Sequence, residues 1–325
     1  MTAFKDNSLI RKEIFLSILG LAMSIGIAYS QSEGSEAAVA ADTSIQQNEV
    51  NQVIVAEQQA VSGLEIQTVQ IPAGKFVMGS PDAEVNHNKN EGQYPVALSV
   101  YKMSKYEITN AQYANFLNEW KIGADGIFEA GDYPNQILIF PSTGDFDWGL
   151  HYTKRQWVPV VGFENHPVIN VTWYGAMEFA RYAGGRLPTG AEWENACRAY
   201  TTTPFNTGEC LSNEQANYDW SNPYNTCINN KTYYPGKTQP VGSYLPNAFG
   251  LFDMHGNVWE WCSDWYGPYP TVEQTNPRGP SEGLGREIRG GSWANRAQYC
   301  RSAIRYRSFP DDGNYFLGFR IVMAP

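Results

Sequence analysis

Three segments of the chain place apolar residues at the spacing of an amphipathic helix. In the first, Tyr113, Phe116, Leu117 and Trp120 recur at intervals that bring them to one helix face. The first and last segments begin with a Thr that is followed three residues later by Gln or Glu, the capping-box pattern of a helix start. The middle one ends at two glycines, as helices often do. The pattern predicts helices over residues 109–120, 173–183 and 189–199.

Short apolar runs bounded by Gly, Pro or Asn predict strands. They lie at residues 65–71, 76–78, 97–101 and 168–171. Beyond Tyr200 the helix signals largely end, and the chain becomes rich in Gly, Pro, Asn and aromatic residues. Order in that region must therefore come from packing, bound ions or disulfides rather than from backbone propensity.

The N-terminal segment has the order of a secretory signal peptide. Lys5, Arg11 and Lys12 precede an apolar run over residues 14–28, and small residues follow it. We expect a signal peptide over residues 1–30, with an uncleaved signal anchor as the alternative. Residues 31–62 contain no aromatic residue and predict a flexible stalk, whereas residues 63–325 have a uniform texture and predict one domain.

Composition and charge narrow the classes of function. Aromatic residues make up 14% of the chain and charged residues 17%, which is not the composition of a disordered protein. The formal net charge is −10 and no Lys/Arg-rich run occurs, so we expect no nucleic-acid partner. Five cysteines in an exported chain permit a disulfide. We expect Cys210 and Cys227 to pair, because they flank a loop rich in Asn, Ser, Tyr and Pro.

Four segments carry a resemblance to a known family. They are IPAGKFVMGS (71–80), HPVINVTWYGAMEFARYAGGRLPTGAEWENACR (166–198), NAFGLFDMHGNVWEWCSDWY (247–266) and RGGSWANRAQYCRSAIRYRSFPDDGNYFLGFR (289–320). Together they resemble the sulfatase-modifying-factor family, whose best-known members are the formylglycine-generating enzymes. The resemblance implies an α+β domain related to the C-type lectin fold. Such a domain has a small twisted antiparallel sheet, few helices and much irregular structure.

The resemblance also implies a catalytic centre, and here this sequence departs from the family. The family holds copper(I) between two cysteine thiolates and oxidises a substrate cysteine to formylglycine. In this chain Asn295 stands in place of the first cysteine and Cys300 in place of the second. Ser292 and Trp259 match the active-site serine and tryptophan, whereas Phe316 replaces an asparagine. An amide is a poor ligand for copper(I), so we do not expect a working copper site.

Cys300 can be interpreted in three ways. It can be a buried free thiol packed among neighbours such as Trp293 and Ile304, which we favour. It can instead be a metal ligand. It can also be a redox-active thiol of low pKa, because Arg296 and Arg301 lie close to it in sequence.

The resemblance implies calcium sites as well. The ligand positions of one family site fall on Asp253, Glu260 and the carbonyls of Gly256 and Val258, a hard-oxygen set that suits calcium. Alternatively, the two acids cap turns and pair with arginines. The ligands of a second site fall on Asn217 and the carbonyl of Tyr218, but Tyr233 stands where the family has an acid.

Two classes of function remain. The sequence favours a non-catalytic protein that binds a protein or other extracytoplasmic ligand through its C-terminal surface, over a formylglycine-generating or related thiol-oxidising enzyme. A membrane partner is expected only if the signal segment stays uncleaved. The candidate surface consists of Asn295, Arg296, Gln298, Tyr299, Ile304, Tyr306, Ser308, Phe309, Asn314, Tyr315 and Phe316.

The mixture of residue types on this candidate surface has two interpretations. It resembles the variable region of proteins diversified by retroelements, in which exposed aromatic residues and Asn suit adaptable recognition. It is equally that of an ordinary family member whose loop has drifted. A near-copy of the coding segment that differs chiefly at adenines, beside a reverse transcriptase, distinguishes the first from the second.

Overall fold

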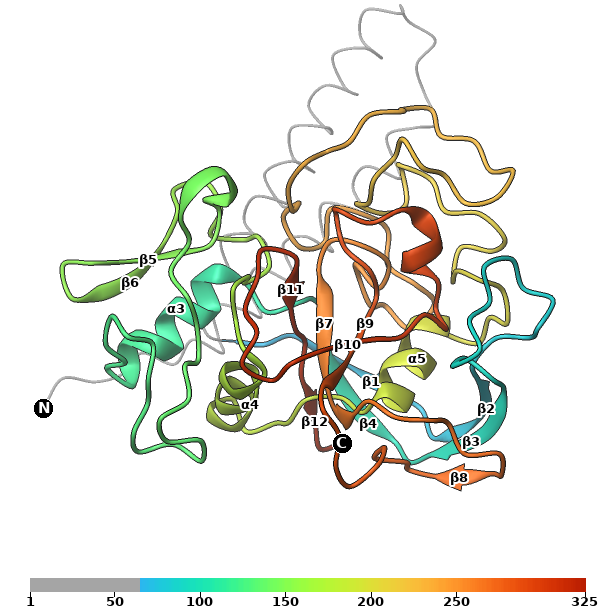
Figure 1. Cartoon of the computed structure of the whole chain (residues 1–325), viewed down its shortest axis with the longest axis horizontal. Coiled ribbons are helices and arrows are strands. Elements are labelled where there is room, and N and C mark those ends of the chain that lie inside the picture. Colours follow the sequence, from blue (N-terminus) through green and yellow to red (C-terminus); the bar gives the residue numbers. More distant parts are fainter. Residues whose placement is uncertain (1–64) are drawn as a thin grey trace, which may run out of the picture. The chain divides into compact units, whose positions relative to one another are not determined.

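The computed structural model describes residues 65–325, so the predicted signal peptide and stalk lie outside the described residues. All three predicted helices are confirmed, and each is about three turns long (Figure 1). Thr109 and Thr189 both form the predicted capping boxes, and Gly184 follows the middle helix with a φ of 74°. The helices are α3 (Asn110–Glu119), α4 (Trp173–Tyr182) and α5 (Gly190–Arg198).

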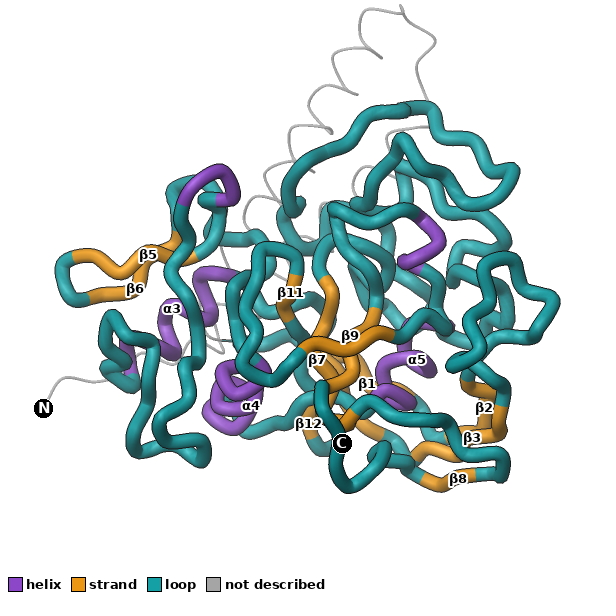
Figure 2. Tube along the Cα trace, viewed as in Figure 1, coloured by secondary structure: helices purple, strands orange, loops and turns teal. Residues whose placement is uncertain are grey.

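Within residues 65–325 the strands are short and form four small sheets, with loops making up most of this part of the chain (Figure 2). One sheet has the order β1 (Thr68–Ile71), β4 (Tyr101–Ser104) and β12 (Val322–Met323). A second has the order β2 (Gly74–Met78), β3 (Tyr94–Leu98) and β8 (Gln274–Thr275). The hairpin of β5 (Leu150–Thr153) and β6 (Gln156–Pro159) stands by itself.

The largest sheet carries the C-terminal segments singled out in the sequence. Its order is β10 (Tyr306–Ser308), β9 (Arg286–Arg289), β7 (Trp259–Trp265) and β11 (Leu317–Gly318). The β7–β9 and β9–β10 pairs are antiparallel, whereas β11 runs parallel to β7. The expected fold, with few helices, small sheets and much irregular structure, is therefore confirmed.

Two of the four predicted strands are wrong. Residues 97–101 span the turn between β3 and β4 instead of forming one strand. Residues 168–171 form no strand, because Asn170 has a φ of 60°, which interrupts an extended backbone. The segment instead connects separate parts of the fold, with Val168 N donating to Ile108 O at 2.8 Å and Asn170 N to Asn314 O at 2.9 Å.

A buried chain of alternating charges joins α5 to β9 and to the segment after it. Arg198 Nε lies 2.9 Å from Glu194 Oε1, and Arg289 Nη1 lies 3.1 Å from Glu194 Oε2. Arg289 Nε also lies 2.7 Å from Glu287 Oε1, and Arg305 pairs with the other oxygen of Glu287. All five side chains are almost fully buried. Buried ions are tolerated when each is paired and hydrogen-bonded, as these are. We refer to these five residues as the ion network.

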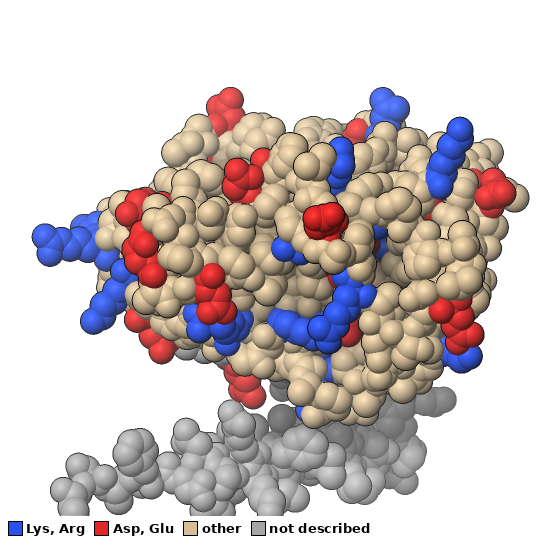
Figure 3. Space-filling model, turned by 60° about the horizontal axis from the view of Figure 1, so that its bottom comes forward, with Lys and Arg blue, Asp and Glu red and all other residues tan. Residues whose placement is uncertain are grey.

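The surface and hydropathy of the described residues add two observations. On the face drawn in Figure 3, Lys and Arg side chains are interspersed with Asp and Glu, without one extended basic patch. Among residues 65–325, no helix is long and apolar enough to cross a bilayer.

Candidate functional site

Two glycines after β9 shape the backbone of the candidate site. Gly290 and Gly291 have φ values of 97° and 75°, which other residues rarely adopt. A Cβ atom on Gly291 would also lie 2.6 Å from Cys300 Sγ and equally close to the carbonyl oxygen of Tyr299. The GGS sequence is therefore required for the turn that brings Ser292 against the segment ending at Cys300.

Asn295 is the centre of a small hydrogen-bonded group. Its Oδ1 accepts a hydrogen bond from Ser292 Oγ at 2.7 Å and another from Trp259 Nε1 at 2.8 Å. The structure thus brings together Asn295 and both side chains that match the family's active-site serine and tryptophan. The amide oxygen uses both of its acceptor directions on these donors. The group contains no thiolate at the position of the first copper ligand.

Cys300 lies at the end of the 3₁₀ turn η2 (Ala297–Cys300) and is fully buried. It packs in a cluster with Phe205 and Tyr218. The predicted burial is confirmed, but the predicted neighbours are wrong. Trp293 and Ile304 belong to other core clusters, whereas Cys300 Sγ packs against Gly291 and its own cluster.

The interpretation of Cys300 as a thiol of low pKa is wrong. Burial raises the pKa of Cys300 well above its usual value, because a thiolate there would lose its hydration. Arg301 gives no compensation, since its guanidinium pairs with Glu84 at 2.6 Å and with Glu91 at 2.8 Å. Arg296, the other candidate cation, is exposed. Cys300 is therefore a neutral thiol at neutral pH.

The candidate surface is accessible except at one position. Arg296, Tyr306 and Phe309 are exposed. Ile304 is 1% exposed, so its assignment to the surface is wrong. The reason is the ion network, because Arg289 Nη1 donates to the carbonyl of Ile304 at 3.1 Å and holds this segment inside. The other members are half-buried, namely Asn295, Gln298, Tyr299, Ser308, Asn314, Tyr315 and Phe316.

Aromatic rings lie beside the Asn295 group and along the rest of the candidate surface. The ring of Tyr306 lies 5.6 Å from that of Trp259 and 6.0 Å from that of Tyr299. Tyr315 stacks on Phe146 with 3.8 Å between ring centroids. Phe146 ends the short turn η1 (Gly144–Phe146), far away in sequence and outside every segment that resembled the family, so the sequence gave no signal for it.

The first candidate calcium site contains a third carboxyl group that the sequence analysis missed. Glu107 is buried and accepts hydrogen bonds from Asn257 Nδ2 at 2.6 Å and from Val258 N at 3.3 Å. Asp253 is buried with a φ of 56°, and its Oδ2 accepts from Gly242 N at 2.7 Å. Glu107 lies more than 140 residues before Asp253, which is why no motif pointed to it.

Glu260 already has a cationic partner. Its two carboxylate oxygens accept from Arg320 Nε and Nη2 at 2.7 Å each, and Trp193 Nε1 donates to it as well. The alternative to calcium ligation was that Asp253 and Glu260 pair with arginines. The structure shows such a pair for Glu260. No such pair is formed by Asp253 within the described part of the chain.

Negative charge is in excess around these carboxyl groups. Burial, together with the nearby charges of Asp253 and Glu260, raises the pKa of Glu107 well above its usual range. Burial likewise raises the pKa of Asp253 to about 6. Arg320 faces all three acids. A hard cation beside Glu107 and Asp253 would therefore stabilise their charged forms.

The second candidate calcium site has one orphaned oxygen. Asn217 Oδ1 is buried and has no hydrogen-bond partner among the described residues, while Asn217 Nδ2 donates to Asn257 Oδ1 at 3.1 Å. Tyr233 is 54% exposed and its ring packs on Trp220, so it does not replace the missing acid. Within residues 65–325, no three His, Cys, Asp or Glu side chains form a metal-binding group. The second candidate site thus depends on amide and backbone oxygens.

A disulfide closes the loop that contains Asn217 and Tyr218 of the second calcium candidate. It joins Cys210 to Cys227, with 5.7 Å between their Cα atoms. The remaining cysteines, Cys197, Cys262 and Cys300, are free and buried. A disulfide is consistent with an extracytoplasmic location.

Comparisons with known proteins agree with this architecture. Residues 54–325 match the family model described as a sulfatase-modifying factor enzyme 1-like domain. The formylglycine-generating enzyme of Mus musculus is 33% identical over 275 residues, which cover 78% of this chain and 73% of that protein.

Two solved structures share the fold. PvdO from Pseudomonas aeruginosa has a TM-score of 0.59 and 26% identity, over 79% of this chain and 94% of that one. Variable protein 1 of Treponema denticola has a TM-score of 0.59 and 24% identity, over 79% and 95% of the respective chains.

Burial of the free thiols predicts that they resist modification. At neutral pH the folded protein should react with none of its three free cysteines on addition of iodoacetamide, because each is buried and burial raises the pKa of all three thiols. In guanidinium chloride all three should react. Mass spectrometry counts the adducts, and Cys300→Ser identifies those on Cys300. Rapid modification of Cys300 in the folded protein would contradict the assignment of a neutral, buried thiol.

Proposed function

Since the chain belongs to the family of sulfatase-modifying factor enzyme 1-like domains, we propose that it is a non-catalytic member that binds a ligand or partner protein through its C-terminal surface. One observation carries the proposal. Asn295 occupies the position of the first copper cysteine, and its amide oxygen is engaged by Ser292 and Trp259. Ser292 and Trp259, which match the family's active-site serine and tryptophan, thereby both donate hydrogen bonds to an amide oxygen.

The copper group does not fit the residues present. Copper(I) prefers soft sulfur ligands, and two thiolates are needed for the near-linear site that the family uses. Here one of the two positions offers an amide oxygen, and the single remaining thiol, Cys300, is protonated and fully buried. We therefore derive no oxidation step for this chain.

The surface around Asn295 suits recognition instead. Tyr306 and Phe309 are exposed and Tyr299 and Tyr315 are half-buried, and aromatic side chains give large contact areas at low conformational cost. Arg296 adds an exposed cation within the same segment. An extracytoplasmic protein is the partner that fits this mixture best. We also propose diversification by a retroelement as one origin of the residue types on this surface. The binding properties of the surface do not depend on that origin.

Catalysis is the second candidate, and one observation favours it. Ser292, Trp259 and Cys300 all remain at the positions that match the family's active site, and the mouse formylglycine-generating enzyme is 33% identical. A formylglycine-generating oxidase would require a second sulfur ligand from the substrate or from elsewhere in the chain.

Calcium is the cofactor that the described residues fit. We propose one ion held by Asp253, Glu107 and the carbonyls of Gly256 and Val258. Glu260, whose carboxylate is held by Arg320, lies beside this ion as a further carboxylate. A second ion would take the orphaned oxygen of Asn217 and the carbonyl of Tyr218. An ion at either place would stabilise the irregular loops and would take no part in chemistry. Export to the periplasm, cell surface or medium accords with calcium and with the disulfide.

Copper binding tests the non-catalytic proposal. Under anaerobic conditions, wild-type protein should fail to withdraw copper(I) from a colorimetric chelator, because it lacks the second thiolate. Asn295→Cys should withdraw about one equivalent, because it restores the pair of soft ligands.

Two control variants make the copper result specific. Asn295→Ser alters the same hydrogen bonds without adding sulfur, so it should not withdraw copper(I) from the chelator. The double variant Asn295→Cys, Cys300→Ser should no longer withdraw the equivalent of copper(I) that Asn295→Cys alone withdraws. Wild-type protein that binds one copper(I) in a Cys300-dependent manner would overturn the proposal.

Removal of calcium tests the proposed ions. Wild-type protein should unfold at a lower temperature in chelator than in calcium, because an ion at 100 times its Kd stabilises the folded state by about 2.7 kcal/mol. Asp253→Asn should lose most of the difference, whereas Asp311→Asn, an exposed site, should keep it. Thermal unfolding followed by circular dichroism measures both. Equal unfolding temperatures with and without calcium would contradict the assignment.

A further inference from the structure

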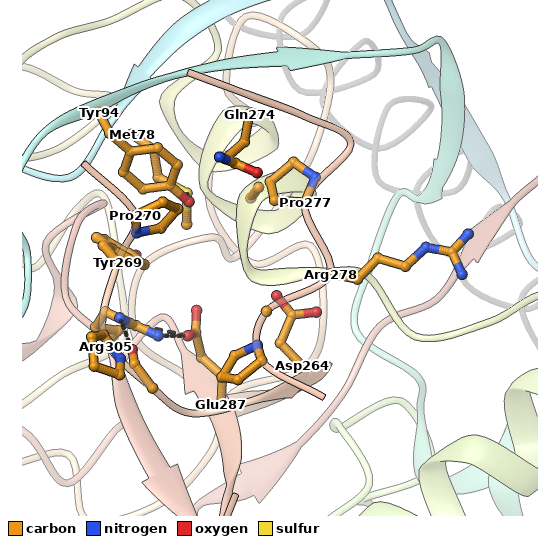
Figure 4. A pocket seen from close by; sticks show the side chains of 15 residues that line it. Met78, Tyr94, Asp264, Tyr269, Pro270, Gln274, Pro277, Arg278, Glu287 and Arg305 are labelled. Atoms are coloured by element: carbon orange, nitrogen blue, oxygen red, sulfur yellow. Dashed lines mark hydrogen bonds and ion pairs between the residues drawn. The ribbon is translucent and has the colours of Figure 1, made fainter. Parts of the chain in front are cut away.

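A cavity of about 330 Å³ borders the ion network at Glu287 and Arg305. The segment between β7 and β9 contributes four prolines to its lining, Pro268, Pro270, Pro277 and Pro280. Figure 4 shows Tyr94, Met78 and Tyr269 along one side. Prolines have no backbone N–H, so these walls are apolar and offer few hydrogen-bond donors. We refer to it as the proline-walled cavity.

The floor of the proline-walled cavity is charged. Asp264, Glu287 and Arg305 line it, and each is at least nine-tenths buried. In Figure 4 the carboxyl groups of Asp264 and Glu287 lie on the same side of the cavity, with Arg305 pairing to Glu287. A charged floor beneath apolar walls predicts a ligand that combines a charge with apolar groups.

The arginines of the floor cannot take an anion. Arg305 donates Nε and Nη2 to Glu287 and Nη1 to the carbonyl of Gly267 at 2.8 Å. Arg289 behind it is engaged by Glu194, Glu287 and the hydroxyl of Tyr269. Arg278 also lines the cavity but is exposed, and in Figure 4 its side chain points away from the other labelled residues.

Asp264, in contrast, has acceptor capacity left. It accepts one hydrogen bond from Gly190 N and one from Ser263 Oγ, each at 3.1 Å, whereas a carboxylate can accept about four. Within the described residues it forms no ion pair, although Arg289 and Arg305 are paired nearby. A buried carboxyl group without a cationic partner is costly to ionise.

The electrostatic environment of Asp264 also favours a cation. Burial and the charge of Glu287 raise the pKa of Asp264 to about 7, while the Gly190 amide at the start of α5 and Arg289 of β9 oppose this shift. A positive group beside Asp264 would stabilise its charged form. The ring of Tyr94, whose centroid lies 5.0 Å from that of Tyr269, offers π-electron density to the same group, whereas the guanidinium of Arg305 already lies 3.9 Å over the Tyr269 ring.

We propose that the proline-walled cavity binds a small organic ammonium ion with apolar substituents, seated on Asp264 and enclosed by Tyr94, Tyr269 and the four prolines. The volume suits a small molecule rather than a folded partner. The cavity shares no lining residue with the C-terminal surface or with the proposed calcium sites, so ligand binding here can be tested separately from both.

Isothermal titration calorimetry of the disulfide-intact protein tests the proposal, with choline as the probe. Choline should bind, and its uncharged isostere 3,3-dimethylbutan-1-ol should bind at least about tenfold more weakly, because it lacks the charge that pairs with Asp264. Asp264→Asn keeps the shape of the side chain and should weaken choline binding about tenfold or more. Asp311→Asn, an exposed carboxylate outside the cavity, should leave binding unchanged.

A charge-swap pair covers the case in which Asp264→Asn fails to fold. Gln274 lines the cavity and is half-buried, so it tolerates substitution better than the floor. Gln274→Lys should weaken choline binding, and Gln274→Glu should strengthen it, each by several-fold. The proposal is overturned if choline does not bind, if the neutral isostere binds equally well, or if the two Gln274 variants bind alike.

Discussion

The ion network is the interaction on which most of the functional architecture depends. Arg289 lies at its centre and contacts Glu194 of α5, Glu287 of its own strand and the carbonyl of Ile304. On one side the network positions the end of β9, from which the Gly290–Gly291 turn leads to Ser292. Through Glu287 and Arg305 it also forms part of the floor of the proline-walled cavity. Breaking a buried pair leaves an uncompensated charge, which costs about 3–5 kcal/mol, so both regions depend on the same contacts.

The Asn295 group satisfies two donors at the candidate site. Ser292 and Trp259 both donate hydrogen bonds to the amide oxygen of Asn295, so neither of these two donors is left unsatisfied. Cys300 is held in the core as an apolar residue. The result is a stable, half-exposed aromatic surface around an amide, which is the chemistry of recognition.

Local signals predicted the helices well, and long-range contacts limited the rest. Thr109 and Thr189 specify their helix starts through neighbours three residues away, so the sequence alone located them. Strand β7 was missed because Trp259, Glu260, Trp261 and Cys262 are all buried, which removes the alternation that marks a strand. Burial of Ile304, the contribution of Glu107 and the stacking of Phe146 depend on residues distant in sequence.

The central claim is that this chain binds without oxidising. The most direct measurement incubates the purified protein with copper(I), dioxygen and a cysteine-containing peptide and follows aldehyde formation by mass spectrometry. The account predicts no formylglycine product under conditions in which a formylglycine-generating enzyme converts the same peptide. Catalytic formation of the aldehyde by the wild-type chain, lost in Cys300→Ser, would contradict it.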